Sequence, residues 1–384
     1  MPEHKVPGVY LEEASFRATS IEGVPSGTAG FAGLTRSGPA RGRPRPVTSF
    51  TEFERVYGGL ELLTVGKQPR LPYVAHAARA FFLNGGQRLY VARIDVRMRI
   101  ADFARALAVL AGIEEVEVVA LPDSGDLGGE AASRKAAREL VAHVERQRHR
   151  IAVLDPPVGS STAQVRAFRA QFDSSRAALY YPWVAVADPS GTALRSKARQ
   201  RLLLPPCGFI SGVYARGDVA KGPAGEIVGA IGFERTIAKA EADVLNPDAI
   251  NVLRTVAGRG QRVVGTRTLS SDAEWKYVSV RRLLSFLERS IEQGTEWVAF
   301  EPNNERLWGH VRRTIDDFLL VQWRTGTLLG TKPEAAYFVR CDRTTMTQDD
   351  LDSGRLVCLI GVAVLRPAEF VAFRIGRRTA DAKN

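Results

Sequence analysis

The sequence predicts one α/β domain and one α+β domain, with an extended strand-forming arm at each end. In the first part of the chain, strand-like apolar segments alternate with amphipathic helices, which is typical of a parallel sheet covered by helices. In the last third, two long helices precede the strands, an order typical of an α+β domain. The length of 384 residues, with 45% hydrophobic and 25% charged residues, suits two or three globular domains. We place the N-terminal arm at residues 1–25, the α/β domain at 26–235 and the α+β domain at 236–384, with a C-terminal arm at 366–384.

The first predicted element is a short strand at residues 6–13. Val9 and Leu11 alternate with Tyr10 and Glu12, so one side of this strand is apolar. A polar stretch and then the glycine-rich residues 23–33 follow it. This composition predicts a flexible root for the N-terminal arm.

Helical spacing begins in the α/β domain at residue 74. Apolar side chains recur at i, i+3, i+4 and i+7 up to Phe82, and Gly85 and Gly86 should end this helix before a strand at 89–94. Further strands are predicted at 116–121, 151–154 and 183–187, and helices at 130–148 and 163–172. Because strands and helices alternate, we expect a largely parallel sheet.

Two amphipathic helices open the α+β domain. The first ends at Gly294, before a short predicted strand at 297–300. Asn303 is expected to cap the second helix, which runs to Arg324 and stops before Gly326. The apolar stripes consist of Val280, Leu283, Leu284, Leu287 and Ile291 in the first helix, and of Leu307, Val311, Ile315, Phe318 and Leu319 in the second.

The chain ends with two strand candidates, residues 356–365 and 369–375, which Pro367 separates. A strand at each end of the chain lets a subunit add strands to the sheets of its neighbours, because main-chain hydrogen bonds supply the affinity. The same strands can instead pair within their own subunit, and the pattern leaves both arrangements open. The candidate residues for strand exchange are Val6, Val9, Tyr10, Leu11, Phe370, Val371, Phe373 and Ile375.

The motifs of common enzyme classes fail on spacing. Gly66 and Lys67 lack the upstream glycine and the following hydroxyl of a phosphate-binding loop, and Ser211 misses the nucleophile elbow by one position. The five histidines are scattered, so no metal pair is indicated. We therefore predict no catalytic, cofactor-binding or metal-binding residues and no enzyme. A hydrolase on the α/β domain, with a site built from distant residues, stays open as an alternative.

The formal net charge of +11 and the pI near 9.8 raise the question of a nucleic-acid partner. The densest basic cluster lies between Arg36 and Arg45, where proline and glycine predict an exposed loop. No helix-turn-helix, finger or aromatic stacking motif accompanies it, so we expect no nucleic acid, and a basic nucleic-acid-binding protein remains the second alternative.

Targeting and redox signals are weak. The first residues contain no apolar signal region, and the apolar run at 356–365 is too short to span a bilayer, so we expect folding in a cytosol without membrane insertion. Cys207, Cys341 and Cys358 contain no C-x-x-C pair and are expected to be buried, reduced thiols.

Several blocks occur in a characteristic order: GFISGVYARGDVAKGPAGE from Gly208, WKYVSVRRL from Trp275, FEPNNERLW from Phe300, FVRCD from Phe338 and RPAEFVAF from Arg366. With these blocks the chain resembles the contractile tail sheath protein family, which comprises the sheath subunits of phage tails, pyocins and extracellular contractile injection systems. The likeness extends from VPGVYLEE at Val6 to the last strand near Ile375.

The resemblance implies a structural subunit that polymerises as stacked hexameric rings around an inner tube. The sheath would contract without nucleotide and drive the tube through a target envelope. The implied partners are further copies of the chain, the inner tube protein, and baseplate and terminal cap proteins. Assembly would occur in a bacterial cytoplasm, and the product would be a phage virion tail or an injection particle. The α/β domain would lie outside, and the α+β domain would line the inside.

The second helix of the α+β domain carries a candidate surface for the tube. At 100° per residue, Arg306, Arg313 and Arg324 fall within about 20° of one another, opposite the apolar stripe. These arginines can form a simple solvated face. The resemblance implies instead that they rest on an acidic tube.

Overall fold

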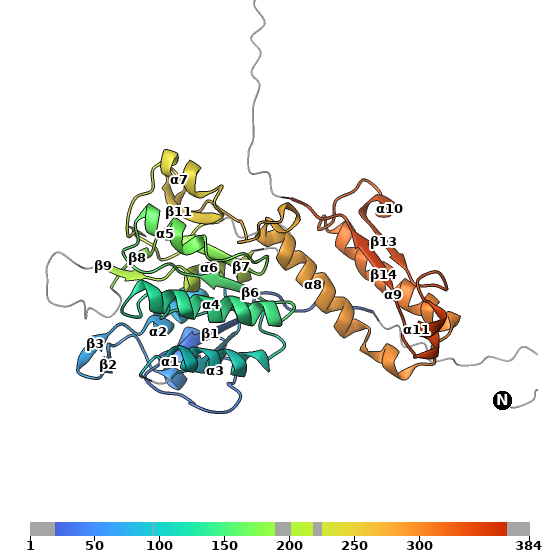
Figure 1. Cartoon of the computed structure of the whole chain (residues 1–384), viewed down its shortest axis with the longest axis horizontal. Coiled ribbons are helices and arrows are strands. Elements are labelled where there is room, and N and C mark those ends of the chain that lie inside the picture. Colours follow the sequence, from blue (N-terminus) through green and yellow to red (C-terminus); the bar gives the residue numbers. More distant parts are fainter. Residues whose placement is uncertain (1–19, 95, 189–200, 218–224, 367–384) are drawn as a thin grey trace, which may run out of the picture. The chain divides into compact units, whose positions relative to one another are not determined.

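The computed structural model describes residues 20–94, 96–188, 201–217 and 225–366 (Figure 1). Both predicted terminal strands, 6–13 and 369–375, lie outside these ranges. The described residues form two compact units. We call residues 23–289 with 364–366 the sheet unit, and residues 20–22 with 290–363 the hairpin unit.

A seven-stranded sheet forms the centre of the sheet unit, in the order β12-β11-β7-β6-β5-β1-β4. All neighbouring strands pair parallel except β11 and β12, which are antiparallel. The strands are β1 (Ala29–Gly33), β4 (Leu89–Arg93), β5 (Val118–Ala120), β6 (Ile151–Leu154), β7 (Ala177–Tyr181), β11 (Ile250–Val256) and β12 (Gly260–Val263). The predicted α/β architecture with a mainly parallel sheet is confirmed.

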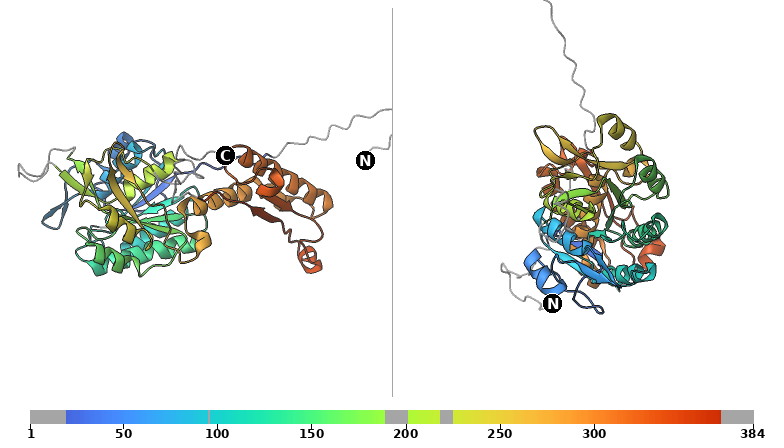
Figure 2. Two further views of the ribbon diagram at one scale, coloured as in Figure 1. Left: turned by 90° about the horizontal axis from the view of Figure 1, so that it is seen from above. Right: turned by 90° about the vertical axis from the view of Figure 1, so that its left-hand side faces the viewer.

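Helices cover both faces of this sheet (Figures 1 and 2). One face packs against α1 (Phe50–Tyr57), α2 (Tyr73–Leu83) and α6 (Cys207–Arg216), and the other against α3 (Ile100–Ala111), α4 (Glu130–Arg146), α5 (Thr162–Arg169) and α7 (Lys239–Leu245). Neighbouring residues of one strand enter opposite cores, as Phe31 and Ala32 of β1 do. Burial on both faces explains the continuous apolar runs of these strands.

Two smaller sheets complete the sheet unit. The antiparallel order β10-β8-β9 joins β10 (Gly232–Phe233), β8 (Val184–Ala187) and β9 (Arg201–Leu204), and β2 (Leu63–Val65) pairs with β3 (Gln68–Arg70). The strand predicted at 183–187 exists as β8, but its place in the parallel sheet was wrong. The parallel position belongs to β7, which is buried along its whole length.

The prediction of a flexible root at the glycine-rich residues 23–33 was wrong, because this segment contains the central strand β1. A Cβ at Gly33 would lie 2.4 Å from Asp123 Oδ2, and one at Gly30 would lie 2.9 Å from Val116 Cγ1. The glycines therefore allow close packing around a buried strand.

The sheet unit also extends past the predicted boundary at residue 235. β11 pairs parallel with β7, which places residues 250–256 inside the same sheet. The unit ends at Arg289, within helix α8 (Val278–Gly294), which follows the short 3-10 helix η1 (Ala273–Trp275).

The hairpin unit is built on helix α9 (Glu305–Arg324) and the antiparallel strands β13 (Tyr337–Arg340) and β14 (Leu359–Val362). Between them lie the short helices α10 (Pro333–Ala336) and α11 (Gln348–Asp352). The predicted strand at 297–300 was wrong. Val298 N–H donates to Thr295 O and Glu301 N–H to Val298 O, and these i to i+3 bonds form the 3-10 helix η2 (Glu296–Phe300).

Candidate functional site

Within the described ranges, β13 and β14 pair only with each other, although just past the end of β14 Ala363 O accepts from Leu329 N–H at 2.8 Å. Tyr337 lies opposite Val362 and Arg340 opposite Leu359, and no other strand in the described ranges joins them. A two-stranded sheet is marginal by itself, and its outer N–H and C=O groups are a template for another strand. The pair is therefore the best candidate in the hairpin unit for accepting a strand.

The two faces of this strand pair differ. Tyr337 is buried, and its hydroxyl donates to Asp316 O of α9 at 3.4 Å. On the other face Phe338 is 56% and Leu359 49% exposed. Phe338 covers Gly361, where a Cβ would lie 2.2 Å from its ring. One face thus packs on the helix, and the other presents an apolar surface.

Helix α9 confirms the predicted apolar stripe and corrects its cap. Leu307, Val311, Ile315, Phe318 and Leu319 are all buried. Asn304, not Asn303, caps the helix by accepting from Leu307 N–H at 3.0 Å, because Asn303 Oδ1 already accepts from Trp308 Nε1–H at 2.7 Å.

The three predicted arginines of α9 lie on its exposed side. Arg306, Arg313 and Arg324 are all exposed, and they are aligned along about 27 Å of the helix at 1.5 Å per residue. Arg313 Nε–H donates to Gly309 O of the same helix at 3.3 Å. The helix thus presents three arginines opposite its buried stripe, with the exposed Asp317 between Arg313 and Arg324 on the same side.

A buried ion pair fixes α8 to the sheet unit. Arg282 Nε lies 2.9 Å from Glu117 Oε1, and the two side chains are 1% and 10% exposed. Arg282 also donates to Tyr214 O at 3.1 Å, with its guanidinium 4.9 Å from the centre of that ring. Glu117 Oε2 accepts from Gly27 N–H. This network joins α8, α6 and β5 to the residues just before β1.

Two buried carboxyl groups lie at the carboxyl ends of β5 and β6. Asp123 accepts from Leu34 N–H at 2.7 Å, and burial raises its pKa to about 6. Asp155 accepts from Cys207 N–H at 2.8 Å, and burial raises its pKa to about 7. Burial, reinforced by Asp155, raises the pKa of the Cys207 thiol well above its usual value. This thiol stays protonated and is a poor nucleophile, so the cluster favours a structural role over hydrolysis.

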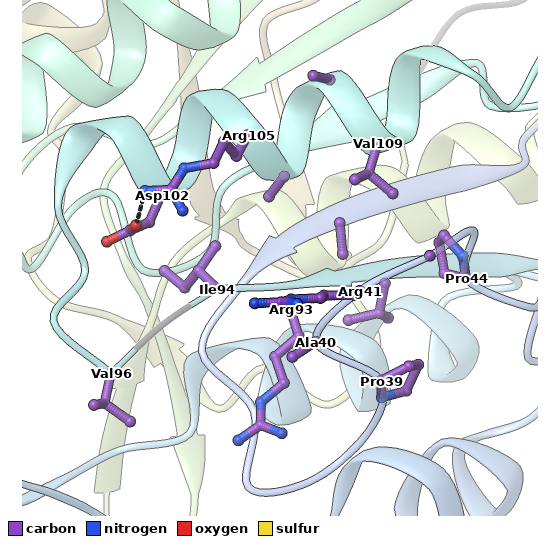
Figure 3. A pocket seen from close by; sticks show the side chains of 15 residues that line it. Pro39, Ala40, Arg41, Pro44, Arg93, Ile94, Val96, Asp102, Arg105 and Val109 are labelled. Atoms are coloured by element: carbon purple, nitrogen blue, oxygen red, sulfur yellow. Dashed lines mark hydrogen bonds and ion pairs between the residues drawn. The ribbon is translucent and has the colours of Figure 1, made fainter.

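The arginine-rich loop at 36–45 is exposed, as the sequence predicts, and borders a pocket of about 670 Å³ (Figure 3). Arg41 lines this pocket with Arg93 of β4 and Arg105 of α3. Arg105 Nη2 lies 2.8 Å from Asp102 Oδ1, and Arg93 Nη1–H donates to Gly38 O at 3.0 Å. Arg105 and Arg93 are therefore already bound to other groups of the fold.

Sequence reasoning missed the carboxyl groups at 123 and 155 and the pair of Glu117 with Arg282, because each depends on residues brought together by the fold. Within the described ranges, no helix combines the length and apolar character needed to cross a membrane.

Two family models match the chain in succession. Residues 100–269 match the phage tail sheath protein central domain, and residues 270–377 match the phage tail sheath C-terminal domain. A putative prophage major tail sheath protein of Pseudomonas aeruginosa (strain UCBPP-PA14) is 29% identical over 180 residues, covering 44% of this chain and 44% of the relative. The chain therefore matches less than half of the length of that curated relative.

Solved structures match almost the whole chain. The helical sheath of the anti-feeding prophage in its contracted state gives a TM-score of 0.78 with 28% identity, covering 98% of this chain and 100% of the other. The contracted PVC sheath complex of an extracellular contractile injection system gives 0.78 with 25% identity, covering 98% and 99%.

Proposed function

Because the chain belongs to the phage tail sheath family, we propose that it is the structural subunit of a contractile sheath, in a phage tail or a contractile injection particle. The observation that carries this proposal is the match over 98% of the chain to a helical sheath in its contracted state. The matched chain is covered completely, so the likeness is to a whole sheath subunit. On this proposal the protein acts by polymerising, and it is not an enzyme.

We propose that neighbouring subunits exchange their terminal strands. The predicted strands at 6–13 and 369–375 would add to the edges of β13 and β14 in adjacent copies, through Val9 and Leu11 at one end and Val371 and Phe373 at the other. Residues 20–25 remain with their own subunit, where Ile21 and Val24 are buried. The exposed backbone edges and the apolar face with Phe338 support this step, because strand addition uses main-chain hydrogen bonds and alternate side chains. Such links would hold subunits together while they slide past one another.

Deletion of residues 1–15 tests this exchange. The truncated chain should remain folded, because a donated strand contributes little to the core of its own subunit, and it should form no long polymers. Circular dichroism and electron microscopy measure the two outcomes. Normal tubules from the truncated chain, or loss of its folded signal, would refute the arm assignment.

We further propose that subunits stack as hexameric rings around an inner tube and contract without nucleotide. The work would come from the free-energy difference between extended and contracted packings. The sheet unit, which extends past the predicted range of 26–235, would form the outer domain, and the hairpin unit, within the predicted range of 236–384, the inner one, with Arg306, Arg313 and Arg324 facing an acidic tube. The missing phosphate-binding loop supports contraction without nucleotide.

Baseplate and terminal cap proteins would complete the particle, which we expect to assemble in a bacterial cytoplasm. One of the similar solved structures is a baseplate of the anti-feeding prophage, which supports a place for such a subunit beside a baseplate.

Electron microscopy of the purified full-length chain tests the main proposal. Long hollow tubules should form after dialysis against chelator and without ATP. Discrete particles would contradict a sheath subunit and favour the hydrolase or nucleic-acid alternatives, and a strict need for ATP would refute contraction driven by packing alone.

A further inference from the structure

The register of the hairpin unit brings two cysteines face to face. Tyr337 pairs with Val362 and each following pair moves one residue along both strands, to Arg340 with Leu359. The next opposed positions are Cys341 and Cys358. The sequence gives no hint of this pair, because sixteen residues separate the two thiols and they form no C-x-x-C motif.

The type of pairing suits a disulfide. Ala363 N–H donates to Ala336 O at 2.7 Å, so the pair 336 and 363 is a hydrogen-bonded one. Hydrogen-bonded and non-hydrogen-bonded pairs alternate along antiparallel strands, which makes Cys341 and Cys358 a non-hydrogen-bonded pair with Cα atoms about 4.5 Å apart. This spacing lies within the range of about 4.4 to 6.8 Å that disulfides require.

Neighbouring contacts hold the two thiols together. The Thr345 hydroxyl lies 2.8 Å from Asp342 O, next to Cys341, and 2.7 Å from Val357 O, next to Cys358. A hydrogen bond from the Cys358 thiol lowers the pKa of Cys341, and the charge of Arg312 on α9 acts in the same direction. Cys341 is 2% exposed, whereas Cys358 is only partly buried and can meet a small reagent.

We propose that Cys341 and Cys358 form a reversible dithiol and disulfide site, oxidised by a low-molecular-weight disulfide such as oxidised glutathione. The hydrogen bond to Cys341 raises the pKa of Cys358, but Cys358 is the thiol that the reagent can reach. Cys358 gives up its proton and its Sγ attacks one reagent sulfur, which breaks the reagent S–S bond, forms a mixed disulfide and releases one thiolate that takes up the proton. Cys341 Sγ then attacks Cys358 Sγ and releases the second reduced thiol. The two protein thiols lose two electrons and two protons, which the two released thiols carry away.

The disulfide would fix the register of β13 and β14 without covering their edges. Cys341 shares the strand face of Tyr337, which packs on α9, so the bond would form on the side away from Phe338. It would also close the loop at 342–357. All of these contacts lie within the hairpin unit, so the disulfide is expected whether or not the chain polymerises.

A thiol count on the full-length chain tests the proposal. In denaturant the reduced protein should show three free thiols, from its three cysteines, and after oxidised glutathione one, because Cys207 is fully buried in the sheet unit. A tryptic digest without reductant should contain residues 341–343 joined to residues 356–374, because trypsin does not cleave between Arg366 and Pro367, with two hydrogens fewer than the separate peptides. Dithiothreitol should restore all three thiols.

The variant Cys358→Ser is the matched control. It should keep both remaining thiols through the same treatment, and its circular dichroism spectrum checks its fold. Three free thiols in the oxidised native chain, a link to Cys207, or glutathione adducts without the joined peptide would overturn the proposal.

Discussion

The sheet unit and the hairpin unit differ in how completely they bury their β-strands. The sheet unit encloses seven strands between two layers of helices, and Leu179 and Phe31 are fully buried there. The hairpin unit has two strands on one helix, with Phe338 exposed on the free face. The sheet unit can therefore be stable by itself, whereas the hairpin unit has a surface that further strands would complete.

The largest expected effect is a loss of stability of the sheet unit. Glu117→Ala leaves Arg282 buried without its partner, and we expect a loss of about 3 to 5 kcal/mol in unfolding free energy. Asp248→Ala is the control, because Asp248 pairs with Arg166 at the exposed surface, where loss of a pair costs about 0.2 to 1 kcal/mol. Urea unfolding followed by circular dichroism measures both, and equal losses would contradict the importance of the buried pair.

A second effect links the stability of the sheet unit to pH. Burial raises the pKa of Asp155 from 3.8 to about 7, so the folded state holds this proton more tightly than the unfolded chain. Its contribution to stability is present at low pH and falls by about 1.4 kcal/mol per pH unit as the pH rises from about 4 to about 7. Asp155→Asn keeps the acceptor for Cys207 N–H and should reduce this slope, leaving the part that Asp123 contributes between about pH 4 and pH 6. Urea unfolding of the native chain and the variant at pH 5 and pH 8 measures the pH dependence of the unfolding free energy. The same pH dependence in both proteins would contradict its assignment to Asp155.

A third prediction concerns the exposed apolar face of β13 and β14. Leu359→Lys should alter the unfolding free energy by less than about 1 kcal/mol, because Leu359 is 49% exposed, yet it should suppress tubules. Val264→Lys places the same charge at a 50% exposed position of the sheet unit and should leave tubules intact. Microscopy that finds the same outcome for both variants would refute a special role for the hairpin unit.

The smallest effect on folding concerns α9. Combined Arg306→Glu, Arg313→Glu and Arg324→Glu should barely change stability, since each exposed charge contributes about 0.2 to 1 kcal/mol. Extended sheath should fail to form on tubes, while empty tubules still form. Combined Arg41→Glu, Arg43→Glu and Arg45→Glu reverses three exposed charges in the sheet unit and serves as the control. Full-length extended particles from the α9 variant would exclude a tube-contacting role.

The sequence predicted the amphipathic helix α9 and the buried strands β4, β5 and β6, but it missed the central strand β1. Helix α9 has one buried and one exposed side, so its period was visible in Leu307, Val311 and Ile315. Strand β1 is buried on both faces and contains two glycines, so its composition suggested a loop. The thiols at 341 and 358 and the pair of Glu117 with Arg282 depend on tertiary register, which no local pattern reports.

The exposed edges of β13 and β14 also make a free, unassembled subunit prone to aggregation over time. Unpaired strand edges accept any extended peptide of suitable register, and apolar side chains increase the risk of aggregation. Arg340 places an exposed charge at the end of β13, which discourages indiscriminate pairing. Synthesis that outruns the supply of growing ends would therefore lose subunits to misassociation, so the yield of polymer should depend on the timing of expression as well as on its amount.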